Sequence, residues 1–139
     1  MKSVIDLFSG VGGLGLGAVY AGLDLVGSVE LDEITYNTHL INFPNSGHLR
    51  ADVTQLHGRD LLINFKQSEI YGLIGGPPCQ GFSTIGKRRV NDPRNRLFIH
   101  FIRLVSETQP VFFMAENVKG ILQDKFSDIL STAFKYIEN

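Results

Sequence analysis

The sequence predicts an α/β domain, built on a mostly parallel sheet with helices on both faces. Two observations favour this class: five short apolar runs alternate with segments of helical periodicity, and most runs end in a glycine, proline or acidic residue. The 139 residues, of which 43% are hydrophobic, suffice for one domain with a buried core. Ligands of such sheets bind beyond the carboxyl ends of the strands, so the residues that follow each run are the functional candidates.

The first half of the chain contains three of the five expected strands. Apolar runs predict strands over residues 4–8, 25–30 and 49–52. A run of small residues predicts a helix over 14–21, and apolar residues at helical spacing predict another over 32–43, for which Asp32 is a suitable N-cap. Residues 56–65 are expected to form a weaker helix.

The second half is expected to complete the sheet. Residues 70–74 predict a fourth strand, which Pro77 and Pro78 would end at once. Residues 97–105 are apolar almost all round and predict a buried helix, and residues 111–115 predict a fifth strand. Apolar residues from Leu122 to Ile137 recur at three- and four-residue steps, which predicts an amphipathic helix.

Composition limits the environment of the protein. Because the chain has one cysteine, it cannot form an internal disulfide, which favours a reducing compartment. The sequence has no run of about 18 apolar residues and no signal-peptide pattern at its start, so a cytoplasmic location away from membranes is expected. The net charge of −1 does not indicate a nucleic-acid binder, but residues 87–96 form a locally basic segment. On charge alone, that segment is a solvated loop.

The first three predicted strands end in residues suited to an adenosine cofactor. A glycine-rich turn follows the first strand, and Gly10, Gly12 and Gly15 have the spacing of a dinucleotide-binding fingerprint. Glu30 ends the second strand, where a carboxylate can accept hydrogen bonds from ribose hydroxyls, and Asp52 ends the third, where it can accept from the adenine amine. These features do not distinguish a nicotinamide cofactor from S-adenosylmethionine, and each acid could instead cap a helix.

The last two strand ends carry reactive groups. Cys79 lies in the segment Gly75-Gly76-Pro77-Pro78-Cys79, at the carboxyl edge of the sheet, with several cations close in sequence. Most lone cysteines are buried and inert, whereas a loop position near positive charge favours the nucleophilic thiolate. Glu116 follows the fifth strand and adds a carboxylate at the same edge, although it could also cap a helix.

Together these segments resemble the conserved blocks of the cytosine-5 DNA methyltransferase family of bacterial restriction-modification systems. The matching pieces are DLFSGVGGLGLG at 6–17, Glu30, Asp52, GGPPCQGFS at 75–83 and ENVKG at 116–120, in family order. The resemblance implies a Rossmann-like, S-adenosylmethionine-dependent methyltransferase fold, incomplete at its C-terminal end. It covers residues 1–139 as the N-terminal cofactor-binding and catalytic portion, and no target-recognition domain is visible.

The resemblance also implies roles for individual residues. Cys79 would be the nucleophile that adds to cytosine C6, Glu116 would protonate the flipped base, and Asn117 would support the Pro78-Cys79 loop. The catalytic set is Cys79, Gln80, Ser83, Glu116 and Asn117. The cofactor set is Asp6, Phe8, Ser9, Gly10, Val11, Gly12, Gly13, Glu30, Leu31, Asp52, Val53, Gly76 and Pro78. The set expected to bind double-stranded DNA is Lys87, Arg88, Arg89, Arg94 and Arg96.

The implied reaction transfers a methyl group from S-adenosylmethionine to DNA, leaves S-adenosylhomocysteine and needs no metal. Family members continue with a target-recognition domain and segments that complete the sheet, so the chain is expected to need such segments or a second polypeptide that carries them. A non-catalytic S-adenosylmethionine-binding regulatory module is the alternative hypothesis, and a nicotinamide-dependent dehydrogenase is a third. The regulatory module differs from the methyltransferase in not needing Cys79, and the dehydrogenase differs in the cofactor that it binds.

Overall fold

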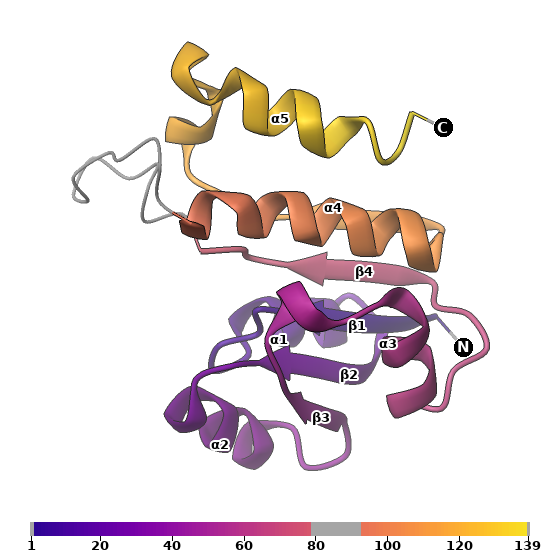
Figure 1. Ribbon diagram of the computed structural model, residues 1–139. Helices are drawn as coiled ribbons and strands as arrows, with labels where there is room; N and C mark the ends of the chain where they lie inside the picture. The colour runs from indigo at the N-terminus through magenta and orange to yellow at the C-terminus, as the bar shows by residue number, and fades with distance from the viewer. Residues whose placement is uncertain (1, 79–92, 139) are drawn as a thin grey trace.

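The computed structural model describes residues 2–78 and 93–138, and these residues form one five-stranded parallel sheet with helices on both sides (Figure 1). The strands are β1 (Ser3–Leu7), β2 (Asp24–Glu30), β3 (Gly47–Arg50), β4 (Gly72–Gly75) and β5 (Phe112–Ala115). They lie in the order β3-β2-β1-β4-β5, and every neighbouring pair is parallel. The predicted fold class and the five predicted strands are confirmed.

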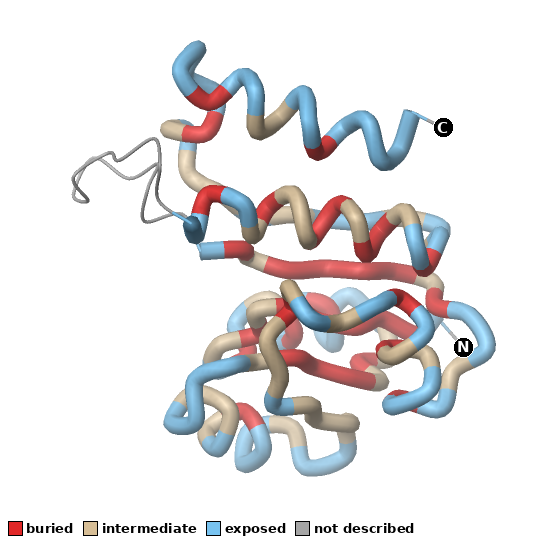
Figure 2. The backbone as a smooth tube through the Cα atoms, viewed as in Figure 1, coloured by how far each residue is buried: buried red, intermediate tan, exposed pale blue. Residues whose placement is uncertain are grey.

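The helices divide between the two faces of the sheet. They are α1 (Gly13–Tyr20), α2 (Glu33–Asn42), α3 (Gly58–Asn64), α4 (Leu97–Thr108) and α5 (Ser127–Phe134). On the face of α1 and α2, Val4, Ala18, Leu25 and Ile74 form a small buried cluster with Phe43 packed against it. On the face of α3 and α4 lies a larger core, in which Leu7 and Leu73 of the sheet are fully buried. Figure 2 shows the burial concentrated along the central strands.

Helix α4 lies between β4 and α5 (Figure 1). Because it contacts other elements on two sides, its residues Phe101, Ile102 and Leu104 are fully buried, as the prediction of a buried helix requires. The helix continues three residues beyond the predicted end and stops at Gln109, which has a left-handed φ of 45°.

Two expected boundaries were wrong. Strand β3 ends at Arg50 rather than Asp52, because the Oδ1 atom of Asp52 accepts a hydrogen bond from the N–H of Thr54 and begins a short 3-10 helix, η1 (Val53–Gln55). The expected helix from Leu122 to Ile137 is divided into two 3-10 turns, η3 (Lys119–Leu122) and η4 (Asp124–Phe126), followed by α5. Leu122 is therefore 72% exposed, and the preceding Ile121 is buried in its place.

The strand order places a topological switch point between β1 and β4. From β1 the chain builds the sheet in one direction through β2 and β3, and then returns to the other side of β1 to add β4 and β5. The loops that leave β1 and β4 therefore diverge and open a crevice beyond the carboxyl ends of these strands, where ligands of doubly wound sheets bind. No helix among residues 2–78 and 93–138 is long and apolar enough to cross a bilayer.

Candidate active site

A tight turn follows β1 and positions the start of α1. Phe8, Gly10 and Gly12 have positive φ values of 56°, 53° and 101°. A bulky residue in the left-handed region is strained and persists only when its surroundings hold it there. The N–H of Ser9 donates to the carbonyl of Val29 at 3.1 Å, and the N–H of Gly12 donates to the carbonyl of Ser9 at 2.9 Å. The backbone of this turn is therefore fixed to β2 as well as to itself.

The Glu30 carboxylate ties the end of β2 to the same turn. Its Oε2 atom accepts a hydrogen bond from the N–H of Gly10 at 2.8 Å, and its Oε1 atom accepts from the N–H groups of Leu31 and Asp32 at 2.8 and 2.9 Å. Asp32 in turn caps α2, because its side chain accepts a hydrogen bond from the N–H of Thr35, as predicted. Glu30 thus organises the loops after both β1 and β2.

A cavity of about 740 Å³ opens at this edge of the sheet. Seven of the predicted cofactor residues line it, namely Phe8, Glu30, Leu31, Asp52, Val53, Gly76 and Pro78. They come from the ends of β1, β2 and β4 and from the segment after β3, so four sequence-distant loops meet at one site. Two of these seven residues, Glu30 and Asp52, bring carboxylates to a lining that also has a large apolar part.

The remaining predicted cofactor residues lie around the turn rather than among the described residues that line the cavity. Asp6 and Ser9 are buried, and Gly10 and Gly13 leave open space where a side chain would begin. Val11 is exposed, and its carbonyl accepts a hydrogen bond from Asn42 at 2.8 Å. Gly12 faces α2, where the rings of His39 and Phe43 occupy the space that a Cβ atom would need.

Asp6 is the most perturbed carboxyl group near the turn. It is 1% exposed, and neither carboxyl oxygen has a hydrogen-bond partner among the described residues. Burial raises the pKa of Asp6 to about 7; the nearby N–H of Gly15 opposes this shift without forming a full hydrogen bond, and the charge of Glu30 adds to the shift. Asp6 therefore changes its charge near neutral pH, in the strand that leads directly into the turn after β1.

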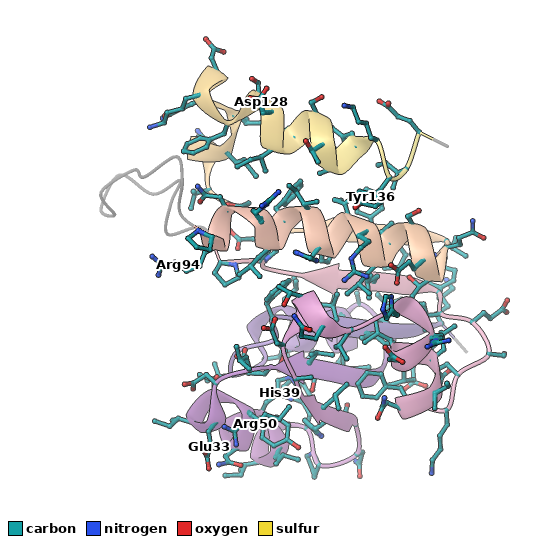
Figure 3. The ribbon with its side chains drawn as sticks, in the orientation of Figure 1. Glu33, His39, Arg50, Arg94, Asp128 and Tyr136 are labelled. Carbon is teal, nitrogen blue, oxygen red and sulfur yellow. The ribbon has the colours of Figure 1, made fainter. Side chains whose placement is uncertain are left out.

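Part of the cavity rim consists of residues that the sequence did not predict. Asp32, Glu33 and Arg50 contribute to the lining, and Arg50 pairs with Glu33 at 3.3 Å on the exposed side (Figure 3). The partners come from β3 and α2, whose register no local pattern specifies. Arg94, expected to bind DNA, also lines the cavity together with Leu97 at the start of α4. Arg96, from the same basic segment, is exposed at the N-terminus of α4.

Glu116 lies beside the segment that leads to the predicted nucleophile. Its N–H donates to the carbonyl of Gly75 at 2.9 Å, and its Oε2 atom lies 3.4 Å from the position that a Cβ atom on Gly76 would occupy. The Oδ1 atom of Asn117 accepts from the N–H of Val118 at 2.8 Å, while its Nδ2 atom is buried with no hydrogen-bond partner among the described residues. Parallel pairing of β4 with β5 accounts for this juxtaposition, because it aligns Gly75 with Ala115.

The central residues of the loop after β4 lie outside the described residues. These are Cys79, Gln80 and Ser83 of the predicted catalytic set, with Lys87, Arg88 and Arg89 of the predicted DNA-binding set. Their roles stay predictions.

Comparison with known proteins agrees with this arrangement. Residues 2–139 match the family model described as C-5 cytosine-specific DNA methylase. The chain is 42% identical over 137 residues to the type II methyltransferase M.XorII of Xanthomonas oryzae pv. oryzae, covering 97% of this chain and 32% of that protein. It is 45% identical over 123 residues to M.DdeI of Desulfomicrobium norvegicum, covering 88% of this chain and 29% of that protein.

A solved structure shows that the fold is shared as well. A crystal structure described as a DNA modification methyltransferase encoded within a prophage of E. coli superposes with a TM-score of 0.88 at 52% identity, covering 99% of this chain and 38% of that chain. The chain thus spans about a third of the length of each of these three proteins. By its family match, its sequence identity and its parallel five-stranded fold, the chain belongs to the C-5 cytosine-specific DNA methylase family.

Proposed function

We propose that this chain is the cofactor-binding and catalytic portion of an enzyme that transfers a methyl group from S-adenosylmethionine to C5 of cytosine in DNA. The observation that carries the proposal is the meeting of Phe8, Glu30 and Asp52 around one cavity, with Glu116 at the same sheet edge. Family membership supports the same reaction, since the relatives are named as type II methyltransferases.

The cavity suits an adenosine-containing cofactor. Its volume of about 740 Å³ falls within the roughly 300–1,000 Å³ typical of small-ligand sites. Of the roughly four lone-pair positions of the Glu30 carboxylate, backbone N–H groups use three, which leaves an acceptor for a ribose hydroxyl. Asp52 would accept from the adenine amine, and Phe8 and Val53 would give the ring apolar contact. S-adenosylmethionine would supply an electrophilic methyl group on its sulfur.

Cys79 and Glu116 would make the cytosine ring reactive. The thiolate of Cys79 forms a bond to C6, and the displaced electron pair makes C5 nucleophilic while negative charge develops at N3. Glu116 donates a proton to N3 and neutralises that charge, an effect worth typically about 10²–10⁴-fold in rate. C5 would take the methyl group as the bond from that group to sulfur breaks, which leaves S-adenosylhomocysteine. A base would then remove the C5 proton, the Cys79–C6 bond would break as the C5–C6 double bond returns, and N3 would give its proton back to Glu116.

The target base must leave the DNA stack to reach this edge of the sheet. The basic residues Lys87, Arg88, Arg89, Arg94 and Arg96 are proposed to contact DNA phosphates at the same edge. Arg94 and Arg96 support this, because both are exposed at the start of α4 and Arg94 reaches the cavity.

DNA sequence recognition is proposed to need further protein. The chain spans about a third of its relatives, and β5 pairs with β4 alone among the described strands. Val111, Phe113 and Met114 on or beside β5 are exposed, and an uncovered strand edge favours pairing with another segment. We propose that this segment belongs to the same polypeptide or to a partner that carries the target-recognition domain.

The test uses DNA that carries 5-fluorocytosine. Fluorine cannot leave as a proton does, so attack by Cys79 in the presence of S-adenosylmethionine should trap the chain on DNA, visible as a shifted band on a denaturing gel. The incubation is made with and without candidate partner chains. Cys79→Ser should abolish the adduct while binding of S-adenosylmethionine persists, and Glu116→Gln should slow its formation.

Other outcomes separate the alternatives. Binding of S-adenosylmethionine without any adduct, under every partner condition and unaffected by Cys79→Ser, would favour a non-catalytic regulatory module. Calorimetry that finds binding of NAD and none of S-adenosylmethionine would favour a dehydrogenase. An Arg59→Met variant on the exposed side of α3 serves as the control for general effects of lost positive charge.

A further inference from the structure

We propose that Arg103 is a positioning residue for the adenine side of the cavity, acting through the backbone of residues 53–56. The inference rests on the proposed function for the identity of the bound cofactor. Arg103 lies on α4 and is not among the described residues that line the cavity, so its effect must pass through the residues that it holds.

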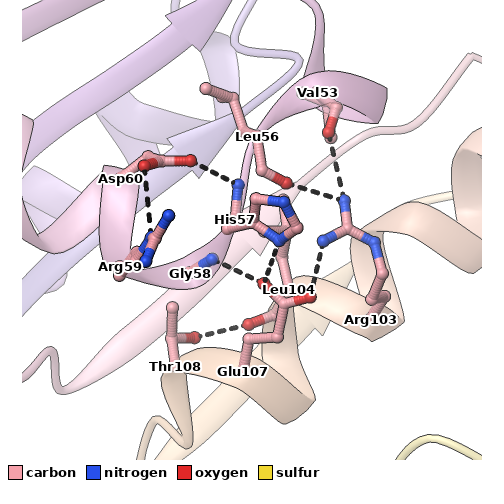
Figure 4. A network of polar contacts seen from close by, with 10 residues as sticks. All are labelled: Val53, Leu56, His57, Gly58, Arg59, Asp60, Arg103, Leu104, Glu107 and Thr108. Atoms are coloured by element: carbon pink, nitrogen blue, oxygen red, sulfur yellow. Dashed lines mark hydrogen bonds and ion pairs between the residues drawn. The ribbon is translucent and has the colours of Figure 1, made fainter.

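The guanidinium group of Arg103 joins α4 to η1 (Figure 4). Its Nη2 atom donates to the carbonyl oxygens of Val53 and Leu56, at 3.3 and 2.9 Å, and its Nη1 atom donates to Oε1 of Glu107 at 2.6 Å. The side chain is 15% exposed, so these bonds are made largely away from water. A planar guanidinium can satisfy several acceptors in fixed directions, which a lysine cannot reproduce.

Glu107, which pairs with Arg103, also contacts the start of α3. Its Oε2 atom accepts a hydrogen bond from the N–H of Gly58 at 2.6 Å and lies 3.8 Å from Nδ1 of His57. Burial alone would raise the pKa of Glu107, but the hydrogen bonds from Arg103 and Gly58 outweigh it and hold the pKa below its ordinary value. The carboxylate is therefore ionised at neutral pH, and one turn of α4 holds both ends of the segment from Val53 to Gly58.

That segment needs an external support, because it carries the adenine side of the cavity on a short element. Asp52 and Val53 both line the cavity, and η1 has three residues. A 3-10 turn of this length has few internal hydrogen bonds to fix its position. The hydrogen bond from Arg103 to the Val53 carbonyl supplies a link between the cavity wall and the rigid helix α4. Loss of that link should loosen the placement of the Asp52 carboxylate, while Glu30 stays in position through Gly10.

The experiment measures base discrimination rather than affinity alone. Isothermal titration calorimetry compares S-adenosylhomocysteine with S-inosylhomocysteine, which has a ring carbonyl where adenine has its amine. With Asp52 held in place, the chain should prefer the adenosyl compound by about tenfold or more, because a carboxylate accepts from the amine and repels the carbonyl oxygen. Arg103→Met should reduce this ratio to about twofold, whereas a purely structural effect would weaken both ligands equally.

Two further variants keep the test decisive. If Arg103→Met fails to fold, Glu107→Gln is used, because it retains an acceptor for Gly58 and removes the charge that orients Arg103; its ratio should also fall. Arg59→Met, whose side chain is 81% exposed and faces Asp60 on α3, is the matched control and should keep the wild-type ratio.

The outcomes distinguish this inference from the proposed function. A wild-type chain that binds neither compound overturns both. A wild-type chain that binds both compounds equally overturns the role of Arg103 and leaves cofactor binding intact. A ratio that is preserved in each folded Arg103 or Glu107 variant likewise overturns the inference.

Discussion

The carboxylate of Glu30 accepts a hydrogen bond of 2.8 Å from the backbone N–H of Gly10, and so joins two segments that are twenty residues apart in the sequence. The other oxygen of Glu30 accepts from the N–H groups that follow β2. One side chain therefore shapes the turn after β1 and the start of α2 before any ligand binds. Glu30 therefore has a structural role in addition to the ribose binding proposed for it.

Glu30→Gln is expected to lower both stability and affinity for S-adenosylmethionine. The amide has one acceptor oxygen in place of two, so either the Gly10 bond or the pair of bonds to Leu31 and Asp32 is lost. The free energy of unfolding should fall by about 1–3 kcal/mol, the cost of leaving such donors unsatisfied. Urea denaturation and calorimetry measure the two effects. Glu69→Gln, at an exposed position before β4, should change stability by less than about 0.5 kcal/mol, and an equal loss in both variants would contradict the role of Glu30.

Gly12→Ala is expected to be strongly destabilising. A Cβ atom at this position would overlap the ring of Phe43 and lie 3.1 Å from Cδ2 of His39, in a backbone conformation with φ of 101°. Overpacking and left-handed strain together should lower the free energy of unfolding by on the order of 3 kcal/mol. Gly13→Ala is the control, since its Cβ would meet open space at the first position of α1. Equal midpoints in a urea titration of the two variants would show that the close approach of Gly12 to α2 does not limit stability.

His39 is expected to make the fold sensitive to mild acid. It is fully buried, its Nδ1 atom lies 2.9 Å from Nε2 of His48 and 3.4 Å from Oγ of Ser28, and its ring stacks on Phe43. Burial and the neighbouring His48 lower the pKa of His39 to about 4, although the charge of Glu30 opposes this. Because the unfolded state binds the proton more tightly, stability is fully present above pH 6.5 and falls as the pH drops toward 4, by on the order of 3 kcal/mol.

The measurement is the free energy of unfolding in urea at several pH values between 4 and 7. His39→Phe keeps an aromatic ring beside Phe43 and should flatten this part of the profile. Arg59→Met, at an exposed position on the other side of the sheet, should retain the wild-type slope. A His39→Phe variant with an unchanged profile would show that another group is responsible.

Asp6 is expected to lower the stability of the fold as the pH rises, which is opposite to the effect of His39. Its pKa is raised to about 7 by burial, so the folded state holds the proton more tightly than the unfolded state. Its contribution to stability falls as the pH rises from about 4 to 7 and is constant above, with a total cost on the order of 4 kcal/mol. Asp6→Asn removes this titration, so the difference in unfolding free energy between the variant and the wild type should grow in favour of the variant over that interval. A difference that is independent of pH would contradict the assignment.

Strand ends were the most predictable part of the site. Buried parallel strands read as apolar runs, and their carboxyl ends meet at one sheet edge, so Glu30, Asp52 and Glu116 could be placed together from sequence order alone. The N-cap at Asp32 was predictable for a similar reason, since the carboxylate acts on a backbone N–H three residues away. Asp52 shows the limit of that reasoning, because its side chain ended the strand early by capping η1.

Contacts between elements were not predictable. Arg50 pairs with Glu33 across the gap between β3 and α2, and Arg103 reaches the backbone of Val53, fifty residues earlier in the chain. Such contacts depend on strand register and helix placement, which are set by packing over the whole core. The exposure of Leu122 was not predictable for the same reason. Its helical spacing predicted a core position, but the chain leaves η3 at this residue and its side chain is exposed.

The sequence alone determined the parallel α/β class, the order of its strands along the chain and the chemical types at their ends, because burial and turn formation leave local patterns. The tertiary structure decided which of those residues share one cavity, which carboxyl groups are perturbed and which arginine donates hydrogen bonds to the backbone of Val53. These properties arise from distances between segments remote in sequence, and the packing of the complete sheet with its helices fixes those distances.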